Sequence, residues 1–198
     1  QKHLLVFRND EIVINGNDGD TVYPQILLTN SNDGKNSFQF QAGLYRMICS
    51  NGLVIADEQF ESVKMCHMGY SFEDLQDMIK EMVGKLPLTV ESMNKMKAIE
   101  MAEEQILAFA KDALNARFTK KEMNRIEVDL KELTTPTRNE DKGSDLWSVF
   151  NVVQEKLIEG DFQYRAGGKV RQARVIKNFK QDTKINKKLF NVALEYAA

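Results

Sequence analysis

The sequence predicts an α+β fold, in which an N-terminal antiparallel, hairpin-rich sheet is packed by several C-terminal α-helices. Residues 1–70 hold short runs rich in β-branched and aromatic side chains, separated by clusters of Asn, Asp and Gly that favour tight turns. Residues 71–198 instead carry apolar side chains at three- and four-residue spacing, which is typical of amphipathic helices. We expect this helical part to include a basic C-terminal segment, and both parts to form one compact domain.

The N-terminal part contains six expected strands, at residues 3–7, 11–14, 22–28, 37–49, 53–56 and 62–67. In the fourth, Phe38 and Phe40 alternate with polar residues, so both rings lie on one face of the strand. The turns between strands contain Gly and Asn, which adopt positive φ at little cost.

The C-terminal part contains a series of helices with recognisable N-terminal caps. Ser71 and Asp74 predict one helix to about residue 85, and a long helix follows Pro87, near residues 88–118. The remaining expected caps are Thr119 with Glu122, for a helix ending near Leu133; Ser144, for a helix through Glu159; and Asp182, for the last helix. Between the last two helices, residues 160–169 include Gly167 and Gly168 and are expected to form a loop.

The composition is that of an ordinary globular protein. The chain has 198 residues, of which 42% are hydrophobic and 28% charged. Its two cysteines cannot form a disulfide framework, which suits a reducing compartment, so we expect a cytoplasmic location. Apolar runs are only a few residues long, so no membrane span is expected.

Catalytic motifs are scarce. Cys49, Cys66 and His67 are the soft metal ligands besides His3, and neighbouring strand residues point to opposite faces, so we expect neither a metal nor another cofactor. No Gly-x-Ser-x-Gly elbow and no glycine-rich phosphate loop is present. The sequence therefore leaves open whether the protein is an enzyme.

The clearest charge feature is a basic segment over residues 161–190. Nine cations and two carboxylates give it a net charge of +7, which leaves −9 for the rest of a chain whose total is −2. The cations are Arg165, Lys169, Arg171, Arg174, Lys177, Lys180, Lys184, Lys187 and Lys188. Phe162, Tyr164 and Phe179 are interleaved with them. Cations can neutralise phosphates while aromatic rings stack on unpaired bases, so the segment predicts single-stranded nucleic-acid binding. The alternative is a solvated helix face with a few buried aromatic residues.

Three further stretches occur in a distinctive order. They are residues 27–34, which end in Asn30-Ser-Asn-Asp33-Gly34; residues 45–53, which contain Arg46, Cys49 and Asn51; and residues 66–69, which contain His67. Together with residues 145–155 and 185–190, this set resembles the phage/plasmid-like protein family of unknown function. Asn32 stands where that family usually has His, and the resemblance implies a longer N-terminal part than this chain carries.

The resemblance implies genes on phages, plasmids and integrated elements, and nucleic acid as the default partner, without an established activity. The motif positions also have a structural explanation, because Asn-Gly forms turns and Cys49 can fill a core. One alternative function is a hydrolase acting on nucleotides or nucleic acid, with a site formed by Asn30, Asp33, Arg46, Asn51 and His67. Another is a protein that interacts with a host-defence component without catalysis. The sequence does not determine the oligomeric state.

One tryptophan lies in the expected helix over residues 144–159. Trp147 is accompanied by Leu146, Phe150, Val153 and Leu157 at helical spacing. We therefore expect it to be buried rather than to serve as a base-stacking platform.

Overall fold

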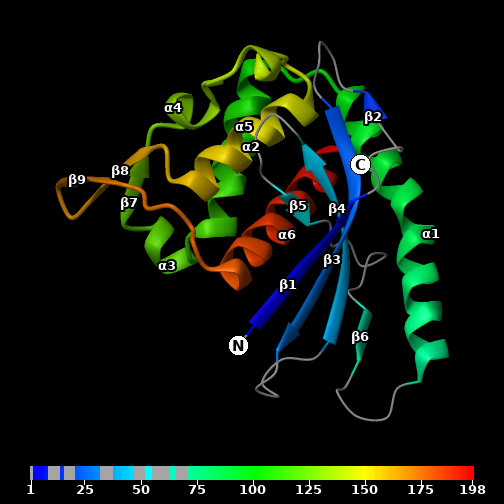
Figure 1. Ribbon diagram of the computed structural model, residues 1–198. Coiled ribbons are helices and arrows are strands. Elements are labelled where there is room, and N and C mark those ends of the chain that lie inside the picture. The colour runs from blue at the N-terminus through cyan, green and yellow to red at the C-terminus, as the bar shows by residue number, and fades with distance from the viewer. Residues whose placement is uncertain are drawn as a thin grey trace. The chain divides into compact units, whose positions relative to one another are not determined.

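The computed structural model describes residues 2–8, 14–15, 21–31, 38–46, 52–54, 63–65 and 71–198. Antiparallel strands precede a series of helices, so the predicted α+β class is confirmed (Figure 1). The chain divides into two compact units, Gln1–Glu91 and Ser92–Ala198, and each is described by itself. This division lies within a helix, α1 (Phe72–Lys97). The expected organisation into a strand-rich part at residues 1–70 and a helical part at residues 71–198 stays a prediction. Whether the two units form one compact domain stays a prediction.

The first unit is built on a six-stranded antiparallel sheet. Its strands are β1 (Lys2–Arg8), β2 (Ile14–Asn15), β3 (Thr21–Ser31), β4 (Phe38–Arg46), β5 (Gly52–Val54) and β6 (Val63–Met65). Their order is β1-β3-β4-β5, with β2 also paired to β3 and β6 also paired to β4. The long strand β3 is the centre of this sheet, and its side chains Val22, Leu27 and Leu28 are buried.

Helix α1 (Phe72–Lys97) follows the sheet and begins with the predicted cap. The Ser71 amide donates to Asp74 Oδ2 at 2.7 Å, and the Asp74 amide donates back to Ser71 Oγ at 3.2 Å. The prediction that one helix ends near residue 85 and another starts after Pro87 is wrong, because Pro87 lies inside α1. Proline lacks the N–H that would reach the carbonyl of residue 83, so α1 loses one hydrogen bond there.

The second unit packs around helix α5 (Leu146–Glu159), of which nearly every side chain is buried. Figure 1 shows α5 among α2 (Glu103–Arg117), α4 (Leu130–Thr134) and α6 (Phe179–Tyr196), all of which contact it. Trp147 is 3% exposed, which confirms the expectation that it is a core residue. Its ring stacks on Phe150 at a centroid distance of 5.9 Å, and Phe150 meets Phe190 of α6 edge-on.

The single long helix expected near residues 88–118 is also wrong. Residues 98–102 separate α1 from α2, because this stretch pairs with the residues before α5 instead. The Leu146 amide donates to the Ile99 carbonyl at 2.9 Å, and the Met101 amide donates to the Ser144 carbonyl at 3.0 Å. These non-local bonds replace the helical ones.

Beyond α2, the predicted helix from Thr119 to Leu133 is three short elements. Its capping box is present, with the Thr119 amide 2.7 Å from Glu122 Oε2, but α3 (Lys120–Met123) is a single turn. Strand β7 (Ile126–Val128) and helix α4 follow, and then the 3-10 helix η2 (Asn139–Asp141). The β-branched Ile126 and Val128 favour the strand.

Where the sequence predicts a loop over residues 160–169, the structure forms a hairpin. Strands β8 (Gln163–Ala166) and β9 (Lys169–Gln172) pair with each other, and β8 pairs with β7. The two-residue connection is Gly167-Gly168, with φ of 58° and 74°. Positive φ at both central residues is the geometry of the tight hairpin turn that glycine permits.

Candidate nucleic-acid interface

Most of the predicted cations lie on one exposed stretch of the second unit, here called the basic surface. Its members are Arg165, Lys169, Arg171, Arg174, Lys177, Lys180, Lys184 and Lys188, and the side chain of each is exposed. They come from the β8–β9 hairpin, from the segment that follows it and from the outer face of α6. Lys187, the ninth predicted cation, is half-buried and has an interaction within the protein, so it is not included.

On α6 the lysines follow the exposed face of an amphipathic helix. Lys180, Lys184 and Lys188 are four residues apart, so successive charges advance ~6 Å along the helix axis. The opposite face carries Ile185 and Leu189, which are buried against the core. The helix begins at Asn178, whose side-chain oxygen accepts from the amides of residues 180 and 181, and not at the expected Asp182.

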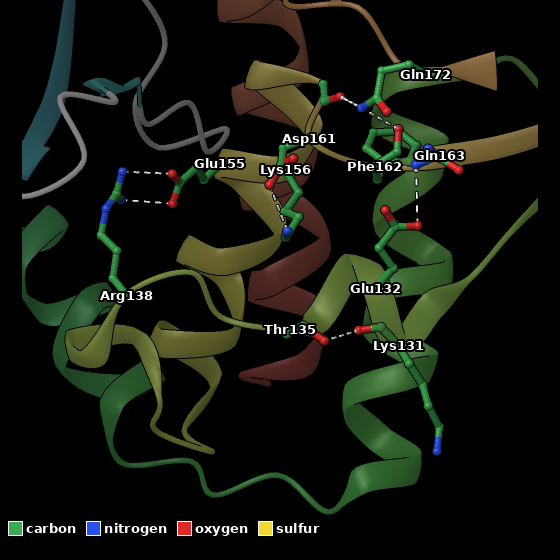
Figure 2. Close-up of polar contacts among 11 residues, drawn as sticks. Lys131, Glu132, Thr135, Arg138, Glu155, Lys156, Asp161, Phe162, Gln163 and Gln172 are labelled. Atoms are coloured by element: carbon green, nitrogen blue, oxygen red, sulfur yellow. Dashed lines mark hydrogen bonds and ion pairs between the residues drawn. The ribbon is translucent and has the colours of Figure 1, made fainter.

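The hairpin is held at its base by polar contacts from both of its strands. Gln172 Nε2 donates to the Gly160 carbonyl at 2.6 Å and to the Phe162 carbonyl at 3.1 Å, as Figure 2 shows. The Gln163 amide donates to Glu132 Oε2 of α4 at 3.4 Å (Figure 2). Gly160 has a φ of 73°, and a Cβ there would lie 2.6 Å from the Arg174 carbonyl carbon. This position therefore requires glycine for both conformation and space.

A half-buried arginine connects α2 to the segment between the hairpin and α6. The Arg117 guanidinium donates to the carbonyl of Leu157, near the end of α5, and to the carbonyl of Arg174 at 2.5 Å. Its Cζ also lies 5.5 Å from the centroid of the Phe162 ring. Burial lowers the pKa of Arg117, and Tyr164 partly offsets that effect. By donating to both carbonyls, Arg117 holds the backbone at Arg174, within the basic surface, close to the end of α5.

The two carboxylates of the basic segment have partners inside the protein. Asp161 Oδ2 accepts from the buried Lys156 ammonium at 2.9 Å (Figure 2). Asp182 is half-buried and accepts from Asn186 Nδ2 at 3.0 Å. Burial, with a smaller effect of nearby Glu159, raises the pKa of Asp182 to about 6. Within the described part of the chain, neither carboxylate forms an ion pair with a cation of the basic surface.

Among the described residues, Arg165 is the one member of the basic surface in an ion pair. It lies 4.0 Å from Glu127 of β7, and both side chains are more than half exposed. The positive charge of the other seven is not neutralised by a described neighbour, so it faces solvent. Exposed cations of this kind are available to bind phosphate groups.

The interleaved aromatic residues fall into two environments. Phe162 is fully buried, so its ring cannot stack on a base in this structure, and this member of the predicted set is wrong. Tyr164 is half-buried and meets Phe118 in an edge contact, with ring centroids 5.6 Å apart. Phe179, at the start of α6, is also half-buried.

The motif positions in the first unit are described only in part. Asp33, Gly34, Cys49, Asn51 and His67 lie outside the described residues. Asn30 is in β3 opposite His3, whereas Arg46 is in β4 opposite Val22. Val22 and Asn30 are eight residues apart on one strand, which is ~26 Å at ~3.3 Å per residue. The two described members of the suggested hydrolase site therefore lie at opposite ends of the β3–β4 pair, and no observation favours that function.

The described residues contain neither a metal-binding cluster nor a membrane-spanning helix. No group of three or more His, Cys, Asp or Glu side chains within those ranges could hold a metal ion. None of the described helices is long and apolar enough to cross a membrane. The candidate ligands Cys49, Cys66 and His67 lie outside these ranges, so the expectation about them stays a prediction.

The second unit thus belongs to the class of α+β structures with a basic hairpin-and-helix surface. The chain belongs to a family of unknown function: residues 1–190 match the model of the domain of unknown function DUF932. It is similar to two proteins of Escherichia coli strain K12, the UPF0380 proteins YafZ and YfjQ. Each is 31% identical over 193 residues, which cover 97% of this chain and 67% of the relative. No solved structure matches the chain.

Proposed function

We propose that the chain binds single-stranded nucleic acid through the basic surface, with low affinity and little sequence preference. The observation that carries this proposal is the exposed row of cations on the hairpin and α6, seven of which lack a carboxylate partner among the described residues. Because phosphates bound by such cations release condensed counterions, binding of this kind is favourable at low salt and weakens as salt rises.

The proposal extends to the setting in which the protein acts. The motif residues Asn30, Arg46, Cys49 and Asn51 resemble those of proteins carried on phages and plasmids. We propose that the chain takes part in the nucleic-acid metabolism of such mobile genetic elements. A whole-chain pI near 5.8 favours a single strand over a duplex, because an acidic body repels the denser charge of double-stranded DNA.

Fluorescence anisotropy with the full chain and a labelled oligonucleotide of about twelve nucleotides tests this proposal, since that length falls within the roughly 4–16 nucleotides that one OB-fold module of a single-strand-binding protein covers. The slope of log K against log salt is ~0.7 per phosphate neutralised, so the eight cations of the basic surface set an upper limit of ~6. Absence of binding at low salt would contradict the proposal, as would binding that does not change with salt.

Matched lysine variants locate the surface. Lys180→Gln with Lys184→Gln removes two exposed charges from α6, and should reduce the salt slope by ~1.4. Lys111→Gln with Lys142→Gln removes two exposed charges outside the basic surface and should leave the slope unchanged. Equal effects of the two double variants would show that net charge, and not this surface, governs binding.

A further inference from the structure

The pairing register of the hairpin divides its side chains between two unlike faces. Residues directly opposite each other on antiparallel strands share a face, and successive residues alternate. Tyr164 is opposite Arg171, and its second neighbour Ala166 is opposite Lys169, so one face carries Tyr164, Arg171 and Lys169. The half-buried Val128 and Ile126 of β7 belong to the same face, because they are opposite Tyr164 and Ala166. The second face carries Arg165, which is opposite Val170 of β9 and opposite Glu127 of β7.

The two faces differ in what they can bind. On the first, the Tyr164 ring lies directly across from Arg171 and diagonal to Lys169, and neither cation has an ion pair with a described residue. On the second, the single cation is already near Glu127, at 4.0 Å. Only the first face therefore combines a ring with unneutralised positive charge.

Tyr164 is also held in place. Its ring contacts Phe118 edge-on at 5.6 Å, and Phe118 contacts the buried Phe162 at 6.3 Å. The turn at Gly167-Gly168 fixes the register that places Arg171 across from it. A half-buried ring anchored in this way loses little conformational freedom when a base stacks on its exposed part.

We propose that this hairpin face is a nucleotide subsite, in which the Tyr164 ring stacks on an unpaired base while Lys169 and Arg171 bind the adjacent phosphates. The inference rests on the proposed function and adds a division of roles to it. The hairpin contacts bases, and Lys180, Lys184 and Lys188 of α6 bind the phosphates of the neighbouring nucleotides.

Paired oligonucleotides separate these roles. A thymidine oligomer and an abasic oligomer of equal length carry the same phosphates, but only the first has bases to stack. Stacking on an aromatic side chain contributes ~1–3 kcal/mol per base, so Tyr164→Leu should weaken binding of the thymidine oligomer about tenfold. Tyr164→Leu should leave binding of the abasic oligomer and the salt slope unchanged. Tyr164→Phe, which keeps the ring, should bind both oligomers as tightly as the wild type does.

The chain offers a matched control in Tyr196. Tyr196 is also half-buried and meets Phe109 edge-on at 5.4 Å, but its hydroxyl donates to Asp112 Oδ2 at 2.8 Å, so a carboxylate lies beside it. Tyr196→Leu should leave binding of both oligomers unchanged. An equal loss in the two leucine variants would point to a general loss of structure and contradict the subsite.

Exposed substitutions keep the test decisive if Tyr164→Leu fails to fold. The double variant Lys169→Gln with Arg171→Gln should weaken binding of both oligomers and lower the salt slope by ~1.4, without changing the thermal stability of the protein. Wild-type binding that is equally tight to both oligomers would refute the subsite and leave the proposed function standing. Failure of the wild type to bind either oligomer would remove the proposed function itself. Tight binding of an acidic peptide in place of both oligomers would assign the face to a protein partner and overturn the inference.

Discussion

Asp182 should make the second unit less stable as pH rises towards neutral. The carboxyl is half-buried on α6, accepts a hydrogen bond from Asn186 and lies near Glu159. Burial is the largest cause that raises its pKa from 3.8 to about 6. Because the folded state holds this proton more tightly than the unfolded state does, stability falls as pH rises from about 4 to about 6, and the loss is complete above that range.

The magnitude follows from that difference in pKa. A rise from 3.8 to about 6 corresponds to ~3 kcal/mol at ~1.36 kcal/mol per unit. Because the group is still partly exposed, solvent screening reduces the expected effect to about 1–2 kcal/mol. The asparagine of Asp182→Asn keeps a side-chain oxygen that can accept a hydrogen bond from Asn186, and its amide group cannot ionise. It should therefore raise the free energy of unfolding by about 1–2 kcal/mol at neutral pH and change it little near pH 4.

Urea unfolding followed by tryptophan fluorescence measures this effect. The chain has one tryptophan, Trp147 in α5, so the signal reports on the unit that contains Asp182. Glu159→Gln serves as a second variant, and should stabilise in the same direction by a smaller amount, because Glu159 is a minor cause of the raised pKa. If Asp182→Asn is no more stable than the wild type at neutral pH, or is stabilised equally at both pH values, the assignment of a raised pKa is wrong.

Three further positions, Trp147, Gly160 and Asp161, test the packing around α5 and the hairpin, and each is compared with a second variant. Trp147→Ala should lower the free energy of unfolding by about 3–5 kcal/mol, measured by circular dichroism, because it empties a buried site; Trp147→Phe, which keeps a ring, should lose clearly less. Gly160→Ala should destabilise by more than ~1 kcal/mol in a thermal melt, since φ is 73° and the new Cβ would lie 2.6 Å from a backbone carbon. Gly84→Ala, inside α1 with nothing within 4 Å of the new Cβ, should not destabilise. Asp161→Asn should lower the melting temperature, because it leaves the buried Lys156 ammonium without its carboxylate, and adding Lys156→Met should recover part of that loss by removing the buried charge.

Much of the architecture could be predicted from local sequence signals. The Ser71 and Thr119 capping boxes are present because each uses a side chain and an amide three residues apart. The burial of Trp147 followed from the apolar residues at helical spacing around it. The β8–β9 hairpin was missed, although Gly167-Gly168 between two short runs is a recognised signal for a tight turn.

The candidate site shows the same contrast. The clustering of Lys and Arg over residues 161–190 is enough to predict its cations, and eight of the nine are exposed. The sequence did not show that Phe162 lies in the core or that Lys187 has a partner within the protein. Nor did it show that Tyr164 shares a face with Arg171, because strand register depends on which residues are paired.

The sequence by itself determined the α+β class, the starts of helices α1 and α3 and the sign of charge along the last forty residues, since each depends on near neighbours in the chain. Only the tertiary structure decided where α1 ends and α2 begins, because residues 99–101 exchange hydrogen bonds with residues 144–146. It also decided which face of the hairpin is charged and unpaired, and which carboxylate has a raised pKa. These features depend on burial and on contacts between residues distant in sequence, and no local pattern carries that information.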